Sequence, residues 1–265
     1  MLHASDVWFA YDSAPVLRGV GLTVPDAGIV GILGPNGSGK TTLLRVLAGT
    51  RRPQRGTVSL DGVPLATLSR AELARRMAVV PQETHLAFDY TVAEVAMMGR
   101  YPHLGAFQIE GPADEAIVDE TLASTGTRHL KDRLFATLSG GEKQRVVIAA
   151  ALAQISGTGG FLLLDEPTAS LDLGYQLEVT TLLRRLHEER GVAILISTHD
   201  LGLAGTLCDR LLMIRAGEVV ADGETGTVLT AAHVRTVFGV EAEIIDRPSG
   251  RRVVVPIGAA RDGGA

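Results

Sequence analysis

Nine residues near the start of the chain, 34–42, read GPNGSGKTT and fit the pattern G-x-x-x-x-G-K-[ST]. They follow the apolar run IVGIL at 29–33 and precede KTTLLRVLAG, where apolar residues recur at helical spacing. Glycines let the backbone N–H groups turn toward phosphate oxygens at the positive end of a helix. Lys40 is expected to reach the β- and γ-phosphates, and the Thr41 hydroxyl is expected to ligate Mg²⁺. The residues predicted to contact the nucleotide are Gly34, Pro35, Asn36, Gly37, Ser38, Gly39, Lys40, Thr41 and Thr42.

Two acidic residues follow a second apolar run, in FLLLDEP at 161–167. The run predicts a buried strand, so Asp165 and Glu166 are expected at its carboxyl end, where open α/β sheets bind ligands. Asp165 would hold Mg²⁺ directly or through water, and Glu166 would polarise the water that attacks the γ-phosphate. On its own, DEP is equally compatible with an ordinary solvated turn. The phosphate loop upstream makes the hydrolytic interpretation the stronger one.

The elements that must position these residues alternate between apolar strands and helices. Short buried runs at 29–33, 161–165 and 192–198 are separated by helical patterns, which predicts a mainly parallel sheet covered on both faces. GTVSLDG at 56–62 and RLLMIRAGEVVADG at 210–223 are typical of antiparallel hairpins. Residues from about 86 to 155 are mainly helical and form an insert. The predicted fold class is therefore α/β.

Composition sets further bounds. The chain has 265 residues, of which 46% are hydrophobic, enough for a substantial core. The net charge of −5 does not indicate a general nucleic-acid surface. The single cysteine, Cys208, excludes an internal disulfide framework. The longest apolar runs fall short of the roughly 20 residues that cross a bilayer, so we expect a chain that reaches a membrane only through a partner.

Seven motifs along the chain together resemble the ABC ATPase family, over residues 1 to about 255. Besides the phosphate loop and DEP, LSGGEKQR at 138–145 is similar to the family's signature and SLD at 170–172 to its D-loop. STHD at 197–200 resembles the switch segment, and VVPQE at 79–83 the Q-loop. FAYDSAPVL at 9–17 looks like the adenine-stacking segment. The resemblance implies a P-loop NTPase with a mainly parallel core sheet, an antiparallel β subdomain and a helical insert carrying the signature.

The resemblance also assigns roles to single residues. Tyr11 would stack on the adenine, and His199 would keep Glu166 and the attacking water aligned at the γ-phosphate. Gln82 would meet Mg²⁺ and this water, and Asp172 would couple two sites across a dimer interface. The signature residues precede a helix and suit an anion contact at its positive end. Those expected to contact ATP bound to a second copy of the chain are Ser139, Gly140 and Gly141.

One phosphate loop and one signature in the chain mean that two complete sites need two copies, which favours a homodimer. Relatives that act on nucleic acid usually carry two cassettes, a long coiled coil or zinc-binding cysteines, none of which is present in this sequence. We therefore expect a transporter subunit without a nucleic-acid partner, working with ATP and Mg²⁺ on the cytoplasmic face of the cell membrane. Its expected partners are two permease subunits and, indirectly, a substrate-binding protein. A soluble ABC ATPase acting on nucleic acid and an exporter subunit remain as alternatives.

The segment DYTVAEVAMMGRYPHLGAF at 89–107 closely resembles the ATPases of iron-siderophore, haem and vitamin B12 uptake. In that group this region receives a cytoplasmic helix of the permease. TVAE is typical of a capping box that starts a helix. For Val92 and Val95 a place in the insert's core is favoured, whereas Arg100 and Tyr101 are expected to be exposed at the permease interface.

The expected domain organisation is an ABC ATPase domain at 1–240, a β-hairpin extension at 241–257 and a disordered tail at 258–265. The carboxyl-terminal residues 237–257 resemble the hairpin ending of iron-chelate uptake ATPases, with RPSGR as the turn.

Overall fold

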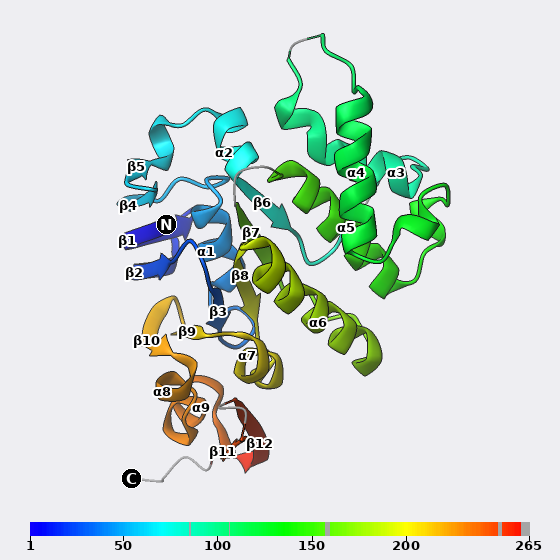
Figure 1. Ribbon diagram of the computed structural model, residues 1–265. Helices are drawn as coiled ribbons and strands as arrows, with labels where there is room; N and C mark the ends of the chain where they lie inside the picture. Colours follow the sequence, from blue (N-terminus) through cyan, green and yellow to red (C-terminus); the bar gives the residue numbers. More distant parts are fainter. Residues whose placement is uncertain (85, 106, 157–159, 249–250, 261–265) are drawn as a thin grey trace. The chain divides into compact units, whose positions relative to one another are not determined.

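The computed structural model describes residues 1–84, 86–105, 107–156, 160–248 and 251–260, and Figure 1 traces its helices and strands. Two compact units make up the chain. The first comprises Met1–Ala66 with Leu195–Ala265, and the second comprises Thr67–Ile194. Strand β8, Ala193–Thr198, crosses the boundary between them, as does the short 3₁₀ helix η1, Leu65–Thr67.

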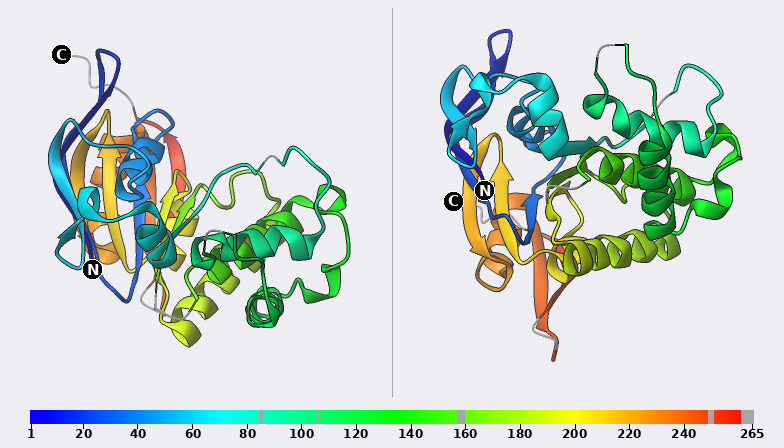
Figure 2. Two further views of the ribbon diagram at one scale, coloured as in Figure 1. Left: turned by 90° about the horizontal axis from the view of Figure 1, so that it is seen from above. Right: turned by 45° about the horizontal axis from the view of Figure 1, so that its top comes forward.

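The first unit contains most of the strands. Its amino-terminal sheet is antiparallel and has the order β2-β1-β4-β5. Its remaining strands include β10, β9, β3 and β8, which neighbour one another in this order. The elements lying wholly in this unit are β1 Leu2–Tyr11, β2 Ala14–Val24, β3 Ile29–Leu33, α1 Lys40–Leu47, β4 Arg55–Leu60, β5 Val63–Pro64, α7 Leu201–Leu207, β9 Arg210–Arg215, β10 Glu218–Glu224, α8 Thr225–Val228, α9 Ala231–Phe238, β11 Val240–Asp246 and β12 Arg252–Ala259. Both views of Figure 2 show β9 and β10 beside the blue strands of the amino-terminal sheet, where Arg18 N donates to Gly217 O at 2.9 Å.

Strand burial explains how the sheet forms. All five residues of β3 are buried, as are all six of β8, because parallel strands covered on both faces are apolar throughout. β3 pairs with β9 in parallel, from Val30 opposite Arg210 to Leu33 opposite Met213. The expected parallel α/β arrangement is therefore confirmed.

The second unit is mainly helical. Its elements are α2 Arg70–Arg76, β6 Met77–Val80, α3 Val92–Met97, η2 Met98–His103, α4 Pro112–Ser124, η3 Arg128–Leu130, η4 Phe135–Thr137, α5 Gly140–Gln154, β7 Phe161–Asp165 and α6 Leu173–Arg190. β6 and β7 pair in parallel, and helices α3 and α4 both pack on α5. This unit thus contains the predicted insert together with the strand that carries the acidic pair.

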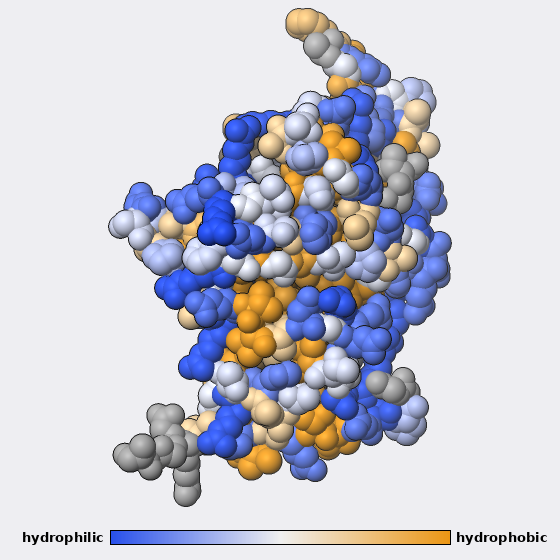
Figure 3. All heavy atoms as spheres, turned by 90° about the vertical axis from the view of Figure 1, so that its left-hand side faces the viewer, coloured by the Kyte–Doolittle hydropathy of each residue, from blue (hydrophilic) through white to orange (hydrophobic). Residues whose placement is uncertain are grey.

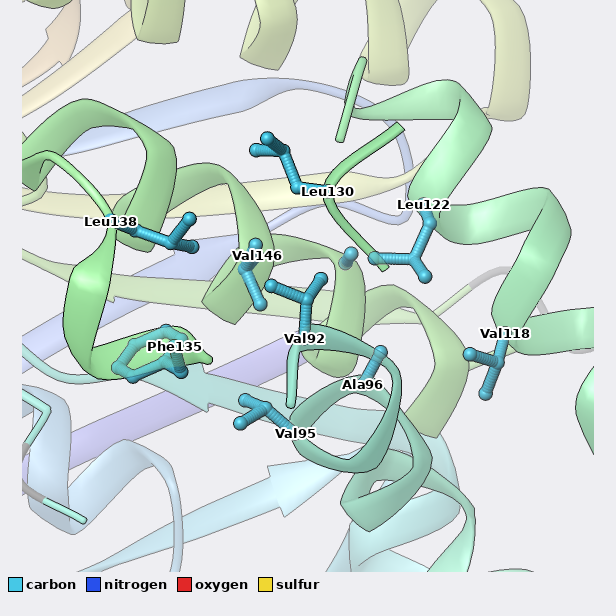
Figure 4. Close-up of a cluster of buried hydrophobic side chains, with 10 residues drawn as sticks. Val92, Val95, Ala96, Val118, Leu122, Leu130, Phe135, Leu138 and Val146 are labelled. Atoms are coloured by element: carbon cyan, nitrogen blue, oxygen red, sulfur yellow. The ribbon is translucent and has the colours of Figure 1, made fainter. Parts of the chain in front are cut away.

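The helices of the second unit meet in one apolar cluster, which Figure 4 shows with side chains from α3, α4 and α5 directed toward one another. Its buried members are Val92, Val95, Ala96, Val118, Leu122, Leu130, Phe135, Leu138, Val146 and Ala149. The preference for Val92 and Val95 as core residues is therefore confirmed. Burial of each valine, leucine or phenylalanine side chain among them contributes about 1.5 to 3 kcal/mol to folding.

Reciprocal capping boxes start three helices of the second unit. At α3, Thr91 N donates to Glu94 Oε2 at 2.7 Å, and Glu94 N donates back to Thr91 Oγ1 at 3.3 Å. Equivalent pairs join Ser69 to Glu72 at α2 and Ser139 to Glu142 at α5. Each pair satisfies backbone donors that the helix itself leaves unbonded.

The carboxyl-terminal residues form an antiparallel hairpin in which Val240 pairs with Ala259 and Asp246 with Arg252. Strand β12 packs on α7, where a side chain at Gly205 would lie 2.4 Å from Arg252 O. Residues 249–250 of the predicted RPSGR turn lie outside the described residues, as do 261–265 of the predicted tail. The hairpin extends to Ala259, two residues beyond the predicted end of the extension.

Across the residues that the structure describes, no helix has both the length and the apolar character needed to cross a membrane. Figure 3 shows one face of the molecule, where hydrophobic side chains surface in small groups among hydrophilic ones.

Cys208 is buried, and burial raises its thiol pKa to about 12. The thiol therefore stays protonated at neutral pH and is a poor nucleophile.

Candidate functional site

The phosphate loop lies in the first unit between β3 and α1. Gly37 and Gly39 have φ angles of 76° and 103°, a backbone region that other residues adopt only with strain. A side chain at Gly34 would lie 2.3 Å from Ile214 O, so that position has no room for one. Gly34 N also donates to Thr198 O at 3.3 Å. The glycines that the motif requires are thus required by this backbone.

Two polar side chains of the loop suit an anionic ligand. Ser38 is 3% exposed, and its buried Oγ has no hydrogen-bond partner in the described structure. Lys40 is 4% exposed, and its Nζ donates to Gly34 O at 2.9 Å and to Pro35 O at 3.1 Å. No side chain caps the amino terminus of α1 at Gly39. A buried hydroxyl, a buried ammonium and the N–H groups of an uncapped helix end can all donate hydrogen bonds to the phosphates of a nucleotide.

Tyr11, the predicted adenine-stacking residue, lies beside the start of α1. Its ring packs edge-to-face on Phe9, with 4.9 Å between the ring centroids, and it remains 39% exposed. The pKa of Tyr11 is held below its ordinary value, first by a hydrogen bond with the Thr42 side chain and then by Arg45 and Arg51. The structure therefore brings Tyr11 and Thr42 together. The two arginines, Arg45 on α1 and Arg51 beyond its end, were not predicted, because a single surface arginine carries no sequence signal.

His199 follows β8 directly and is exposed. The preceding residue, Thr198, accepts the hydrogen bond from Gly34 N that was described above, so His199 leaves the strand beside the first residue of the phosphate loop. Asp200 caps α7 by accepting from Gly202 N at 2.7 Å and from Leu203 N at 3.0 Å. The switch segment thus adjoins the loop within the first unit.

In the second unit, Asp165 ends β7 and is 8% exposed. Glu166 follows with a φ of 46°, a left-handed conformation that is uncommon for a residue with a side chain. Backbone strain of this kind clusters at functional sites, where it fixes a side-chain direction. Val80 lies opposite Leu164 in the β6–β7 pairing, so Gln82, exposed just beyond β6, leaves the same sheet edge as Asp165.

The signature residues begin α5. Ser139 N donates to Glu142 Oε2 at 2.8 Å, and Glu142 N donates to Ser139 Oγ at 3.3 Å. A side chain at Gly141 would lie 2.3 Å from the Tyr175 ring, so this glycine lets α6 approach the first turn of α5. This contact was not foreseen, since Gly141 and Tyr175 belong to separate motifs. Gly140 lies beside Leu171, the middle residue of the predicted D-loop.

Asp172, the last residue of the predicted D-loop, caps α6 by accepting from Tyr175 N at 3.0 Å. Its carboxylate therefore has a structural role in the chain, whatever it does in a dimer.

The residues predicted to hold Mg²⁺ are Thr41 in the first unit and Gln82 and Asp165 in the second. No cluster of three or more His, Cys, Asp or Glu side chains with metal-binding geometry occurs in the part of the chain that the structure describes. Mg²⁺ is usually bound by one or two carboxylates together with substrate phosphates rather than by an all-protein cage. A carboxylate, an amide oxygen and a hydroxyl are each ligand types that Mg²⁺ accepts.

The expectation that Arg100 is exposed is wrong. Arg100 is 7% exposed, and its Nε donates to Asp114 Oδ1 at 2.9 Å. A guanidinium can be buried here because a carboxylate and further oxygen acceptors satisfy its donors. Tyr101, the next residue, is 56% exposed and stays available to a partner.

Replacing Asp114 by asparagine should lower the free energy of unfolding by about 3 kcal/mol at neutral pH, because it leaves a buried cation without its counter-charge. The pKa of Asp114 lies below its ordinary value, mainly because Arg100 donates to it and also because Gly111 N does. The stabilisation is therefore complete above the free Asp pKa of about 3.9 and is lost as pH falls through the lowered value.

Urea unfolding from neutral pH to about pH 3 would measure this difference. Asp119→Asn is the matched control. Asp119 lies on α4 like Asp114, but its partner, Arg128, is exposed. Equal destabilisation by the two variants, or a difference that does not shrink in acid, would contradict the assignment.

Comparison with known proteins agrees with this geometry. The pattern of the ABC transporter family matches residues 17–169. The hemin import ATP-binding protein HmuV of Gloeobacter violaceus is 42% identical over 265 residues, covering 98% of this chain and 95% of that protein. HmuV of Bordetella pertussis is 40% identical over 261 residues, covering 96% and 98%. The cobalamin import ATP-binding protein BtuD of Halobacterium salinarum is 40% identical over 243 residues, covering 91% of this chain and 60% of that protein.

Solved structures give the same result. A transporter assigned to the metal-chelate type, in an inward-facing conformation, aligns with a TM-score of 0.84 at 27% identity, over 97% of this chain and 96% of that one. A dimeric ATP-binding cassette with bound ADP and Pi, in a post-hydrolysis state, aligns with a TM-score of 0.73 at 28% identity, over 85% and 99%. With its phosphate loop, acidic pair and signature helix in place, the chain belongs to the ABC transporter family and is one of that family's ATPase cassettes.

Proposed function

We propose that the chain hydrolyses ATP to energise a membrane permease that imports an iron chelate, either haem or a siderophore complex, or cobalamin. The observation that carries the proposal is the phosphate loop, with its buried Lys40 and its unpartnered Ser38 hydroxyl. The hemin and cobalamin import relatives, at 40–42% identity, support the cargo class.

The proposed chemistry is phosphoryl transfer to water. The loop amides, Ser38 and Lys40 bind and orient the phosphates, while Thr41, Gln82 and Asp165 would hold Mg²⁺, which neutralises phosphate charge when it is bound. Glu166 takes the proton of the attacking water, and His199 reaches the γ-phosphate and keeps Glu166 and this water aligned.

The proposed active form is a homodimer. Ser139, Gly140 and Gly141 would contact ATP held by the phosphate loop of a second copy, and Asp172 would link the two sites. The helix that follows Ser139 has 15 residues, so its positive amino terminus suits a phosphate. ATP is then part of the interface, and its hydrolysis opens the dimer.

The proposed partners are two permease subunits and, through them, a substrate-binding protein, with the chain on the cytoplasmic face of the membrane. Tyr101 is the residue that we assign to the permease contact, because it is 56% exposed. Exposed tyrosines are suited to interfaces, since they supply a large apolar area and a polar tip.

Uptake measurements test this proposal. Vesicles containing the permease and this chain should accumulate haem, a ferric siderophore or cobalamin only when ATP is enclosed with the chain. The order of the three rates identifies the cargo. ATPase activity stimulated by DNA or RNA instead, or ATP-driven efflux of the same compounds, would contradict the import function and favour one of the two alternatives.

A further inference from the structure

The short 3₁₀ helix η2 is fastened to the carboxyl-terminal end of α5. Arg100 Nη1 donates to Ala153 O and to Ser156 Oγ, both at 2.7 Å, and His103 Nε2 donates to Gln154 O at 2.7 Å. The last carbonyls of an α-helix have no partner within the helix, and its carboxyl end carries partial negative charge. Arg100 and His103 therefore satisfy acceptors that α5 leaves open.

The backbone of η2 also touches α5 directly. A side chain at Gly99 would lie 2.1 Å from Ala150 O, so the two backbones are as close as a glycine allows. From α2, Arg75 Nε donates to Pro102 O at 2.7 Å. The segment is thus held from α2 as well as from α5.

The same arginine reaches a third helix. Asp114 Oδ1 accepts from Arg100 Nε, and Asp114 Oδ2 accepts from Gly111 N at 3.1 Å, at the amino terminus of α4. Arg100 therefore joins η2, α4 and α5 through one buried side chain. We call Arg100, His103 and their acceptors on α5 the α5 latch.

Tyr101 lies in the sequence between Arg100 and His103, the two residues of the latch on η2, and its side chain is exposed. The latch binds the carboxyl-terminal end of α5, and Ser139 lies at the amino-terminal end of the same helix. α5 is continuous between these ends, and Val146 and Ala149 anchor its middle in the apolar cluster. A displacement at Tyr101 therefore has a rigid route to Ser139 that does not pass through a loop.

We propose that Arg100 is a positioning residue for energy coupling, because it holds η2 against α5. Movement of the permease against Tyr101 then moves the signature end of α5, and movement of the signature end moves Tyr101 against the permease. The proposal rests on the proposed function, because it needs a permease at Tyr101. Arg100 itself touches neither nucleotide nor partner and acts through Tyr101.

A double-mutant cycle tests the latch on the chain assembled with its permease in liposomes. Arg100→Gln should leave the ATPase rate of the chain alone within about 2-fold and should lower permease-stimulated hydrolysis and uptake at least 10-fold. Tyr101→Ala should lower both as well. Because Arg100 acts through Tyr101, adding Arg100→Gln to Tyr101→Ala should have no further effect. Arg128→Gln is the matched control, since Arg128 pairs with Asp119 on the same α4 but is exposed, and it should change none of these rates.

If Arg100→Gln does not fold, His103→Ala removes a second bond of the latch while the buried ion pair stays intact, and the same cycle applies to it. Multiplicative losses in the double variant, or a parallel fall in the ATPase rate of the chain alone, overturn the latch and make Arg100 an ordinary structural residue. A wild-type complex without stimulation or uptake contradicts the proposed function and removes the basis of the latch with it. Stimulated wild type with multiplicative losses contradicts the latch alone.

Discussion

Glu166→Gln should lower kcat for ATP hydrolysis by about 100- to 10,000-fold and leave the affinity for ATP unchanged, because a general base contributes about that factor. Glutamine keeps the size of the side chain and its place after β7, where the backbone of Glu166 has a φ of 46°. The amide, however, does not accept a proton from water at neutral pH. Phosphate release under saturating ATP and titration with a fluorescent ATP analogue measure the two quantities separately.

Glu188→Gln is the control for this variant, since it makes the same chemical change on an exposed position of α6 in the same unit. It should keep the wild-type rate. Hydrolysis by Glu166→Gln within about 10-fold of wild type would remove Glu166 as the base. A parallel loss of ATP binding would instead indicate that the substitution disturbs the strained turn rather than the chemistry.

Lys40→Ala should weaken ATP binding by about 100-fold. A hydrogen bond to a charged group contributes about 1.5 to 3 kcal/mol, and each 1.4 kcal/mol is a factor of ten in affinity. Lys40 Nζ now donates to Gly34 O and Pro35 O, so its ammonium is already held within the loop, and binding costs little side-chain ordering. Equilibrium titration with the same ATP analogue gives the affinity.

Lys131→Ala is the matched control because it removes the same charge from an exposed position of the second unit. Its ATP affinity should equal that of wild type. Affinity of Lys40→Ala within about 3-fold of wild type would contradict the phosphate role of the lysine and leave it a purely structural residue of the loop.

Local signals account for what the sequence predicted well. The phosphate loop, the capping boxes and the fully apolar strands are each encoded within a few residues, and each occurs where it was expected. The core role of Val92 and Val95 also follows from helical spacing alone. Such patterns are readable because a helix or a strand imposes its own period on buried positions.

Arg100 was placed wrongly because its environment is not local. Its partners lie 14, 53 and 56 residues further along the chain, at Asp114, Ala153 and Ser156. An arginine followed by Tyr-Pro-His is typical of a surface position. Only tertiary packing supplies the oxygen acceptors that offset the cost of burying its charge. The contact of Gly141 with Tyr175 escaped prediction for the same reason, since two separate motifs meet there.

The length of α5 sets the scale of motion that the latch can deliver. An α-helix rises about 1.5 Å per residue, so the 15 residues of α5 span about 22 Å. Because Val146 and Ala149 hold the middle of α5 in the apolar cluster, a tilt of about 10° about that middle moves each end by about 2 Å. In the proposed mechanism, a displacement of α5 at its Tyr101 end is therefore matched by an opposite displacement of similar size at Ser139, and the number of residues in this one helix sets that size.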